Sequence, residues 1–312
     1  MDADAIPEIV LEQGNVRAVI TASGAAVRDL RVDGRPLLRS FEPAKRPPGA
    51  ANIVLAPWPN RVNNATFRFD GEDHRLDITE PELGHALHGF TWGRIFDIDA
   101  DTNDGADRTD RTDRTEATLR TVLGPEPGWP WEIALTVRYR LVTGGRDAAS
   151  GADTAAGAGI EATMTAENIG AEAAPCALGV HTYLDPQGAP LDECTLHHGL
   201  TQRQPLDERN IPAGPREPWP DNPIDMAGAW LDDPGFDPEY RTHTAVMVDR
   251  AGKGVGLDAS ISMRWCQLFT SPQRFLAVEP MTAPPNALAT GEDLIVLEPG
   301  DRTSVRWKVR AI

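Results

Sequence analysis

Residues 131–142, WEIALTVRYRLV, alternate apolar and polar side chains, and this stretch predicts a long β-strand with one face toward water. A period of two places the apolar side chains on a single face of a strand. Residues 160–168, IEATMTAEN, suit a partner strand, and we expect them to pair with residues 131–142. The stretch therefore indicates a β-sheet with one face toward the core and one toward water.

Much of the remaining chain repeats this pattern. Residues 15–39 and 67–76 alternate in the same way, and each contains an Asp-Gly pair, the signal of a tight hairpin turn. No convincing amphipathic helix stands out. Further strands are expected at residues 244–249, 255–258, 263–270, 294–297 and 303–309. The sequence therefore predicts an all-β fold, a large antiparallel β-sandwich, in a single domain that spans residues 1–312.

Two segments interrupt the strand pattern. Residues 101–116 contain the charged triplet repeat DRTDRTDRTE, and residues 143–159 are small and rich in Gly and Ala. Neither segment offers the apolar side chains that a packed core needs. Because strand patterns flank both segments directly, we interpret them as flexible loop insertions at hairpin tips and not as domain linkers.

Composition limits the classes of partner. The chain has 312 residues and a formal net charge of -17, which argues against nucleic acid and anionic membranes as partners. A neutral ligand such as a sugar is compatible with this charge. Three scattered cysteines indicate neither a disulfide framework nor a zinc site. The first residues lack the features of a signal peptide and no apolar run is long enough to span a bilayer, so the cytoplasm is the expected location.

One acidic residue stands at the end of an apolar run. In FLAVEPMTAPPNALA, residues 275–289, Glu279 follows four apolar residues and precedes Pro280. Proline cannot donate to a sheet ladder, so we expect the backbone to leave the sheet directly after Glu279. Partial burial would raise the pKa of Glu279 toward the range of a general base. The alternative is a surface acid that simply follows a strand.

Three further stretches carry candidate polar groups. In APWPNRV, residues 56–62, the guanidinium of Arg61 can donate to ligand hydroxyls, although an ordinary surface turn remains an alternative. GHALHGFTW, residues 84–92, contains a His-x-x-His spacing, but no third ligand follows and no metal is expected. Aromatic residues after these histidines suit a sugar pocket. In ALGVHTYLDP, residues 177–186, His181 can carry a proton near neutral pH, unless the backbone merely satisfies it at a strand end.

Taken together, these stretches resemble the aldose 1-epimerase (galactose mutarotase) family. The resemblance rests on PWPNRV at 57–62, ALHGFTW at 86–92, GWPWEIALTVRYRL at 128–141, NIGAEAAPCALGVHTYLDP at 168–186 and EPMTAPPNA at 279–287. It implies a sandwich of the supersandwich type with its site in an open groove. It also implies an enzyme that interconverts the α and β anomers of a free, glucose- or galactose-like aldose without a cofactor or a metal. The sequence leaves a monomer and a homodimer both open.

The resemblance also implies roles for individual residues. Glu279 matches the general base and His181 the general acid, and we expect the two on opposite sides of the pocket. Sugar-binding roles fall to Asn60, Arg61, His88, Tyr183 and Asp232. The neighbouring Asp233 is an alternative to Asp232 that the sequence does not separate. Two departures bear on specificity: His85 stands where relatives have asparagine, and Ser271 replaces a longer polar residue.

Three other functions compete with this interpretation. A non-catalytic sugar-binding or sensor protein could use the same scaffold, but pure binding does not require an acid and a base. A hexose-6-phosphate 1-epimerase would need clustered basic residues, and the pocket motifs offer chiefly Arg61. The acidic surface gives weak support to a structural or interaction protein, since such a surface more often serves solubility.

Overall fold

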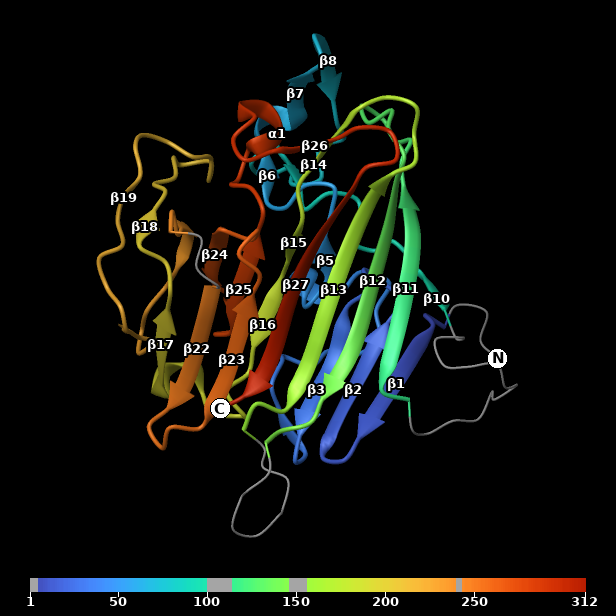
Figure 1. Ribbon diagram of the computed structural model, residues 1–312. Coiled ribbons are helices and arrows are strands. Elements are labelled where there is room, and N and C mark those ends of the chain that lie inside the picture. The colour runs from blue at the N-terminus through green and yellow to red at the C-terminus, as the bar shows by residue number, and fades with distance from the viewer. Residues whose placement is uncertain (1–4, 100–113, 146–155, 240–242) are drawn as a thin grey trace.

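Antiparallel sheets make up nearly all of the computed structural model, which describes residues 5–99, 114–145, 156–239 and 243–312 (Figure 1). The all-β prediction is confirmed. Among the described residues, the largest sheet joins nine strands, in the order β10 (Asp97–Asp99), β11 (Glu116–Leu123), β12 (Ile133–Val142), β13 (Gly159–Asn168), β27 (Arg302–Ala311), β23 (Gly254–Ala259), β22 (His243–Asp249), β17 (Cys194–His198) and β20 (Ile224–Asp225).

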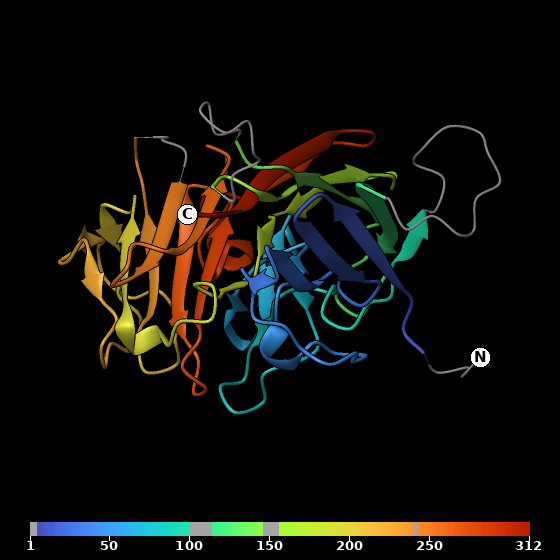
Figure 2. The same cartoon turned by 90° about the horizontal axis from the view of Figure 1, so that it is seen from below.

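A second large sheet of the described residues has eight strands. Within the described ranges its strands are β19 (Glu217–Pro218), β18 (Gln202–Arg203), β21 (Asp232–Phe236), β24 (Trp265–Thr270), β25 (Leu276–Met281), β15 (Gly179–Val180) and β5 (Val54–Leu55), with β16 (Thr182–Leu184) also paired to β25. Figure 2, seen from below, shows the yellow and orange strands on one side of the molecule and the blue N-terminal strands on the other.

Smaller elements complete the architecture of the described chain. A four-stranded sheet contains β1 (Glu8–Gln13), β2 (Val16–Thr21), β3 (Val27–Val32) and β4 (Arg35–Pro36). Three strand pairs are β6 (Arg61–Val62) with β9 (Ala86–Leu87), β7 (Thr66–Phe69) with β8 (Glu72–Arg75), and β14 (Ala174–Cys176) with β26 (Ile295–Leu297). The helical segments are short: α1 (Ala287–Thr290) and the 3₁₀ turns Pro48–Ala50, Asn63–Ala65 and Leu191–Glu193.

The core forms where the alternation of β12 predicts it. Every second residue of this strand, from Ile133 to Leu141, is buried, whereas Arg138 and Arg140 are exposed. The predicted pairing with β13 is present, and its antiparallel register places Leu141 opposite Ile160. The buried Tyr139 donates a hydrogen bond of 2.6 Å to the carbonyl of Ala25, so the long sheet is tied to the N-terminal sheet that packs on it.

The prediction that the backbone leaves the sheet directly after Glu279 is wrong. Strand β25 continues through Pro280 to Met281, and Pro280 still pairs with Cys266 of β24. On the other side of β25, the partner ladder is interrupted between β15 and β16. Pro280 lies at that interruption, so its missing N–H is tolerated inside the sheet.

The two segments predicted as flexible insertions fall largely outside the described residues, which omit 100–113 and 146–155. Their last residues, Glu116 and Gly159, are the first residues of β11 and β13. In the part of the chain that the structure describes, no helix has the length and apolar character to cross a membrane.

Candidate active site

All seven residues that the sequence singles out line one cavity of about 210 Å³. They come from five separate stretches of the chain: Asn60, Arg61, His88, His181, Tyr183, Asp232 and Glu279. Of the adjacent acidic pair, Asp232 lines this cavity, whereas Asp233 forms an ion pair of 3.3 Å with Arg203. Of the two alternatives, Asp232 is therefore the one that borders the cavity.

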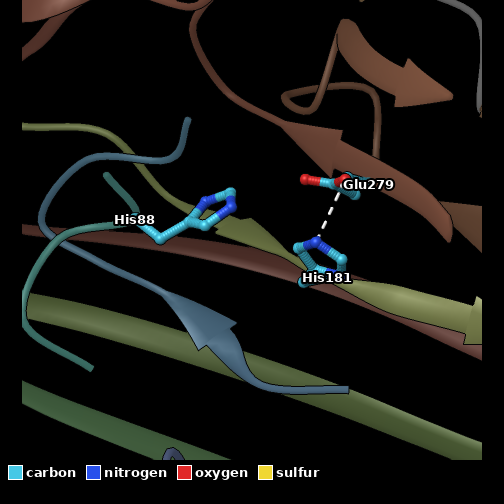
Figure 3. Close-up of side chains that lie close together, drawn as sticks. All are labelled: His88, His181 and Glu279. Atoms are coloured by element: carbon cyan, nitrogen blue, oxygen red, sulfur yellow. Dashed lines mark ion pairs between the residues drawn. The ribbon is translucent and has the colours of Figure 1, made fainter. Parts of the chain in front are cut away.

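His181 and Glu279 are in direct contact. Thr182 pairs with Val278 and Gly179 pairs with Met281, so His181 lies across from Glu279 in the interruption between β15 and β16. Its Nε2 is 3.3 Å from Oε1 of Glu279, and both side chains are buried (Figure 3). The expectation that the two groups stand on opposite sides of the pocket is therefore wrong. Neighbouring backbone segments of one sheet hold them on the same side.

Burial sets the ionisation of this pair. Desolvation raises the pKa of Glu279 well above its ordinary value, and the negative charge of Asp232 adds to the effect. Desolvation also lowers the pKa of His181 to about 4. These shifts favour an uncharged pair, with one proton on Glu279 and none added to His181. Two buried atoms of the pair, Nδ1 of His181 and Oε2 of Glu279, have no hydrogen-bond partner among the described residues.

His88 completes a cluster in which the nitrogen and oxygen atoms of His88, His181 and Glu279 lie within 4.8 Å of one another (Figure 3). Two histidines and a carboxylate are the ligand set of many metal sites. However, the Asn60 backbone N–H donates to Nδ1 of His88 at 3.2 Å, which places the proton of the neutral ring on Nε2. A metal bound through Nε2 would require the opposite tautomer, with two N–H groups facing each other. The cluster therefore fits a metal poorly, and His88 presents a hydrogen-bond donor to the cavity instead.

Arg61 is held by a carboxylate that the sequence analysis missed. Its Nε and one terminal nitrogen donate to the two oxygens of Glu80, at 2.8 and 2.9 Å, and both side chains are largely buried. The opposite edge of the guanidinium remains for ligand hydroxyls. Residues 80–85 form a tight turn in which the backbone of Glu80 bonds to that of His85. Glu80 thus reaches Arg61 only because the β6–β9 pairing folds this turn back, which no local motif signals.

A hydrogen-bonded row connects Asn60 to Asp232 through Gln267. The Asn60 amide donates to Oε1 of Gln267 at 3.3 Å, and Nε2 of Gln267 donates to Asp232 at 2.7 Å. Gln267 is buried directly opposite Glu279 on β24 and was also missed. The available signal was a long polar side chain at an inward position of the strand WCQLFT, residues 265–270. Ser271 accepts a hydrogen bond of 3.1 Å from the backbone N–H of Phe275 and does not line the cavity, whereas Gln267 does.

Aromatic rings form the apolar part of the cavity. Tyr183, Trp92 and Phe269 line it, and the Tyr183 ring lies 5.0 Å from that of His181. Burial raises the pKa of Tyr183, so this phenol stays neutral. Phe90, which follows the histidine motif, instead packs edge-on against Trp58 in the core at 4.9 Å. The site therefore combines flat apolar faces with a ring of hydrogen-bonding groups, the composition that a sugar requires.

Comparisons with known proteins identify the family of this chain. Residues 7–310 match the family model described as aldose 1-epimerase. The uncharacterized protein YihR of Escherichia coli K12 is 27% identical over 301 residues, which cover 94% of this chain and 89% of YihR.

Solved structures share the fold at low sequence identity. A putative aldose 1-epimerase from E. coli K12 gives a TM-score of 0.76 at 18% identity, over 98% of this chain and 99% of the other. A galactose mutarotase-like protein from Clostridium acetobutylicum gives 0.77 at 16% identity, over 99% of both chains. Galactose 1-epimerase from Lactobacillus acidophilus gives 0.74 at 14% identity, over 100% of this chain and 96% of the other. Because the family model spans nearly the whole chain, the protein belongs to the aldose 1-epimerase family.

Proposed function

We propose that the protein is a mutarotase that interconverts the α and β anomers of a free aldose, with Glu279 as general base and His181 as general acid. The observation that carries the proposal is the contact of 3.3 Å between these two buried groups at the wall of a polar cavity. A binding protein needs hydrogen-bonding side chains but gains nothing from an acid and a base in contact. A non-catalytic sugar sensor would therefore not explain why His181 and Glu279 are buried in contact with each other.

The chemistry fits an acid and a base on one side of the cavity. Ring opening removes a proton from the C1 hydroxyl and delivers one to the ring oxygen. These two oxygens are bonded to the same carbon, so neighbouring groups can reach both. Glu279, as carboxylate, takes the hydroxyl proton while the imidazolium of His181 protonates the ring oxygen and the C1–O bond of the ring breaks. Rotation about C1–C2 exposes the other carbonyl face, and the reverse transfers close the ring.

The ionisation of the pair supports this sequence of steps. Opening converts a carboxylate and an imidazolium into a carboxylic acid and a neutral imidazole. That uncharged pair is the form that burial favours. A bound aldose, in turn, promotes the charged form, since its C1 hydroxyl donates to the carboxylate and its ring oxygen accepts from the imidazolium. Binding of the aldose thus shifts the pair toward the charged form from which ring opening starts.

The charge of the cavity favours a neutral aldose over a hexose 6-phosphate. Arg61 is the one cationic side chain among the described residues that line the cavity, and Glu80 already neutralises it. Asp232 adds a carboxylate. A phosphate would meet net negative charge, whereas sugar hydroxyls find both donors and acceptors.

We keep the cytoplasm as the expected location and a monomer or a homodimer as the expected assembly. The three cysteines, at positions 176, 194 and 266, are free and buried, which suits a reducing compartment. Size-exclusion chromatography with light scattering distinguishes the two assembly states.

The proposal is tested by following the optical rotation of freshly dissolved α-D-glucose, α-D-galactose and α-D-glucose 6-phosphate with and without the protein. We expect faster relaxation to equilibrium for at least one free aldose and little effect on the phosphate. Saturable sugar binding without acceleration would support a sensor. Acceleration of the phosphate alone would transfer the proposal to the hexose-6-phosphate enzymes.

A further inference from the structure

A turn outside the cavity reaches one of its acidic residues. Residues 207–211 form this turn, in which Oδ1 of Asp207 accepts the backbone N–H groups of Arg209 and Ile211 at 2.8 and 2.9 Å. Asn210 occupies its tip in the left-handed conformation, with φ of 60°. Asparagine tolerates this conformation better than most residues do. The turn is therefore internally fixed, and its tip presents an amide.

The amide of Asn210 completes the coordination of Asp232. Nδ2 of Asn210 donates to Oδ2 of Asp232 at 3.3 Å, while Gln267 donates to Oδ1 of the same carboxylate at 2.7 Å. Each oxygen of Asp232 thus has one protein donor. Because one donor lies on the turn and the other on β24, together they fix the plane of the carboxylate. The lone pairs that remain free on the carboxylate then point in set directions toward the cavity. Asn210 does not line the cavity itself, so it acts on a ligand through Asp232.

His85 and Arg209 connect the turn of residues 207–211 to the segments that contain Asn64 and Leu83. Nε2 of the buried His85 donates to the carbonyl of Arg209 at 3.0 Å, and its Nδ1 accepts the backbone N–H of Asn64 at 3.2 Å. The guanidinium of Arg209 returns two hydrogen bonds of 2.8 Å, to Oδ1 of Asn64 and to the carbonyl of Leu83. This set of contacts, which we call the His85 clamp, joins three separate segments.

We infer that Asn210 is a positioning residue that orients Asp232 and thereby sets the choice among aldoses, and that the His85 clamp holds it in place. The inference rests on the proposed function, since it assumes that Asp232 receives a sugar hydroxyl. It also gives His85 a purpose. The histidine does not border the cavity but secures the turn that does the positioning.

The test uses two variants that keep the left-handed backbone accessible. Asn210→Gly removes the donor and adopts a positive φ readily. Asn210→Asp keeps the shape but places a second carboxylate against Asp232. We expect KM for the preferred aldose to rise about twofold to tenfold in Asn210→Gly, in line with the loss of one hydrogen bond. We expect a larger rise in Asn210→Asp. The ratio of kcat/KM between α-D-glucose and α-D-galactose should change in both variants, with kcat less affected than KM.

Two further variants test the clamp and supply a matched control. Arg209→Ala should shift the glucose-to-galactose ratio in the same direction as Asn210→Gly. Arg203→Ala removes the partner of the neighbouring Asp233, which does not line the cavity, and should leave the ratio unchanged.

A loss of activity by one common factor for both sugars would overturn the inference, because it would show that Asn210 only preserves the folded pocket. Unchanged KM in both Asn210 variants would overturn it as well. If the unmodified protein accelerates no aldose, the proposed function fails separately. The same variants are then compared by calorimetric dissociation constants for the two sugars. An unchanged ratio of those constants, or no binding at all, would overturn the positioning role.

Discussion

Nε2 of His181 and Oε1 of Glu279 lie 3.3 Å apart, and the two residues face each other across an interruption in the sheet. The sheet thus presents an acid and a base as a unit. A pair at this distance shares its protons, so neither group titrates or acts independently of the other.

Substitutions in this pair should be far from additive. Glu279→Gln and His181→Asn should each lower kcat by about 10²–10⁴-fold, the range for loss of one general acid or base. Because ring opening needs both transfers, the double variant should lose little beyond the worse single variant. Polarimetric kcat values for the four proteins give the coupling directly. Losses that simply multiply would show that the two groups act in separate steps.

The pH dependence of kcat/KM should reflect the pair and not a lone histidine. The active protein carries one proton on the pair, and addition of a second proton is opposed by the low pKa of His181, about 4. Activity should therefore persist below the ordinary histidine pKa of 6.5 and fall only as the pH approaches about 4. A decline centred near 6.5 would contradict the shift. Circular dichroism at each pH separates loss of activity from unfolding. Among the described residues, the other charged or titratable groups that line the same cavity are Arg61, Glu80, His88, Tyr183 and Asp232.

Glu279 should lower stability as the pH rises. Its folded-state pKa is raised, so between its ordinary value of 4.5 and the folded value the native protein binds more protons than the unfolded chain. The free energy of unfolding carries no penalty from Glu279 below pH 4.5, and it falls as the pH increases from 4.5 toward the folded-state pKa. Glu279→Gln removes the effect, so the variant should exceed the unmodified protein in free energy of unfolding by about 1.4 kcal/mol for each pH unit across the window. Urea unfolding at several pH values measures the gap, and a gap that shrinks with pH would refute the assignment.

The buried ion pair of Arg61 and Glu80 should separate stability from sugar binding. Arg61→Ala leaves the largely buried Glu80 without its partner, and we expect a loss of about 1–3 kcal/mol in unfolding free energy together with a higher KM. The double variant Arg61→Ala/Glu80→Ala should regain much of the stability but not the KM. Thermal unfolding and polarimetry report the two effects. Recovery of both in the double variant would mean that Arg61 does not contact the sugar.

Local pattern predicts much of this fold because alternation and turn chemistry act over short stretches. Residues 131–142 and 160–168 pair in the expected manner, and the Asp-Gly pairs at 33–34 and 70–71 form hairpin turns. The order of strands in the sheets is not encoded locally. The last strand, β27, is inserted between β13 and β23, and only packing of the complete chain selects that neighbour.

The residues of the candidate site also fall into those that a local motif predicts and those that depend on contacts between distant segments. Residues inside recognisable stretches, such as His88 and Glu279, were identified from the sequence, and the structure gathers them around one cavity. Glu80, Gln267 and Asn210 were not, since each matters through a contact with a distant segment. Strand continuation through Pro280 was also missed, because it depends on a gap in the neighbouring ladder.

The most direct test of the central claim is mutarotation of α-D-galactose and α-D-glucose by Glu279→Gln, measured beside calorimetric sugar binding by the same variant. We predict that the unmodified protein accelerates mutarotation, and that the variant binds the sugar with similar affinity but no longer accelerates it. Retention of the unmodified rate by Glu279→Gln would contradict the account, because the proposed base would then be dispensable.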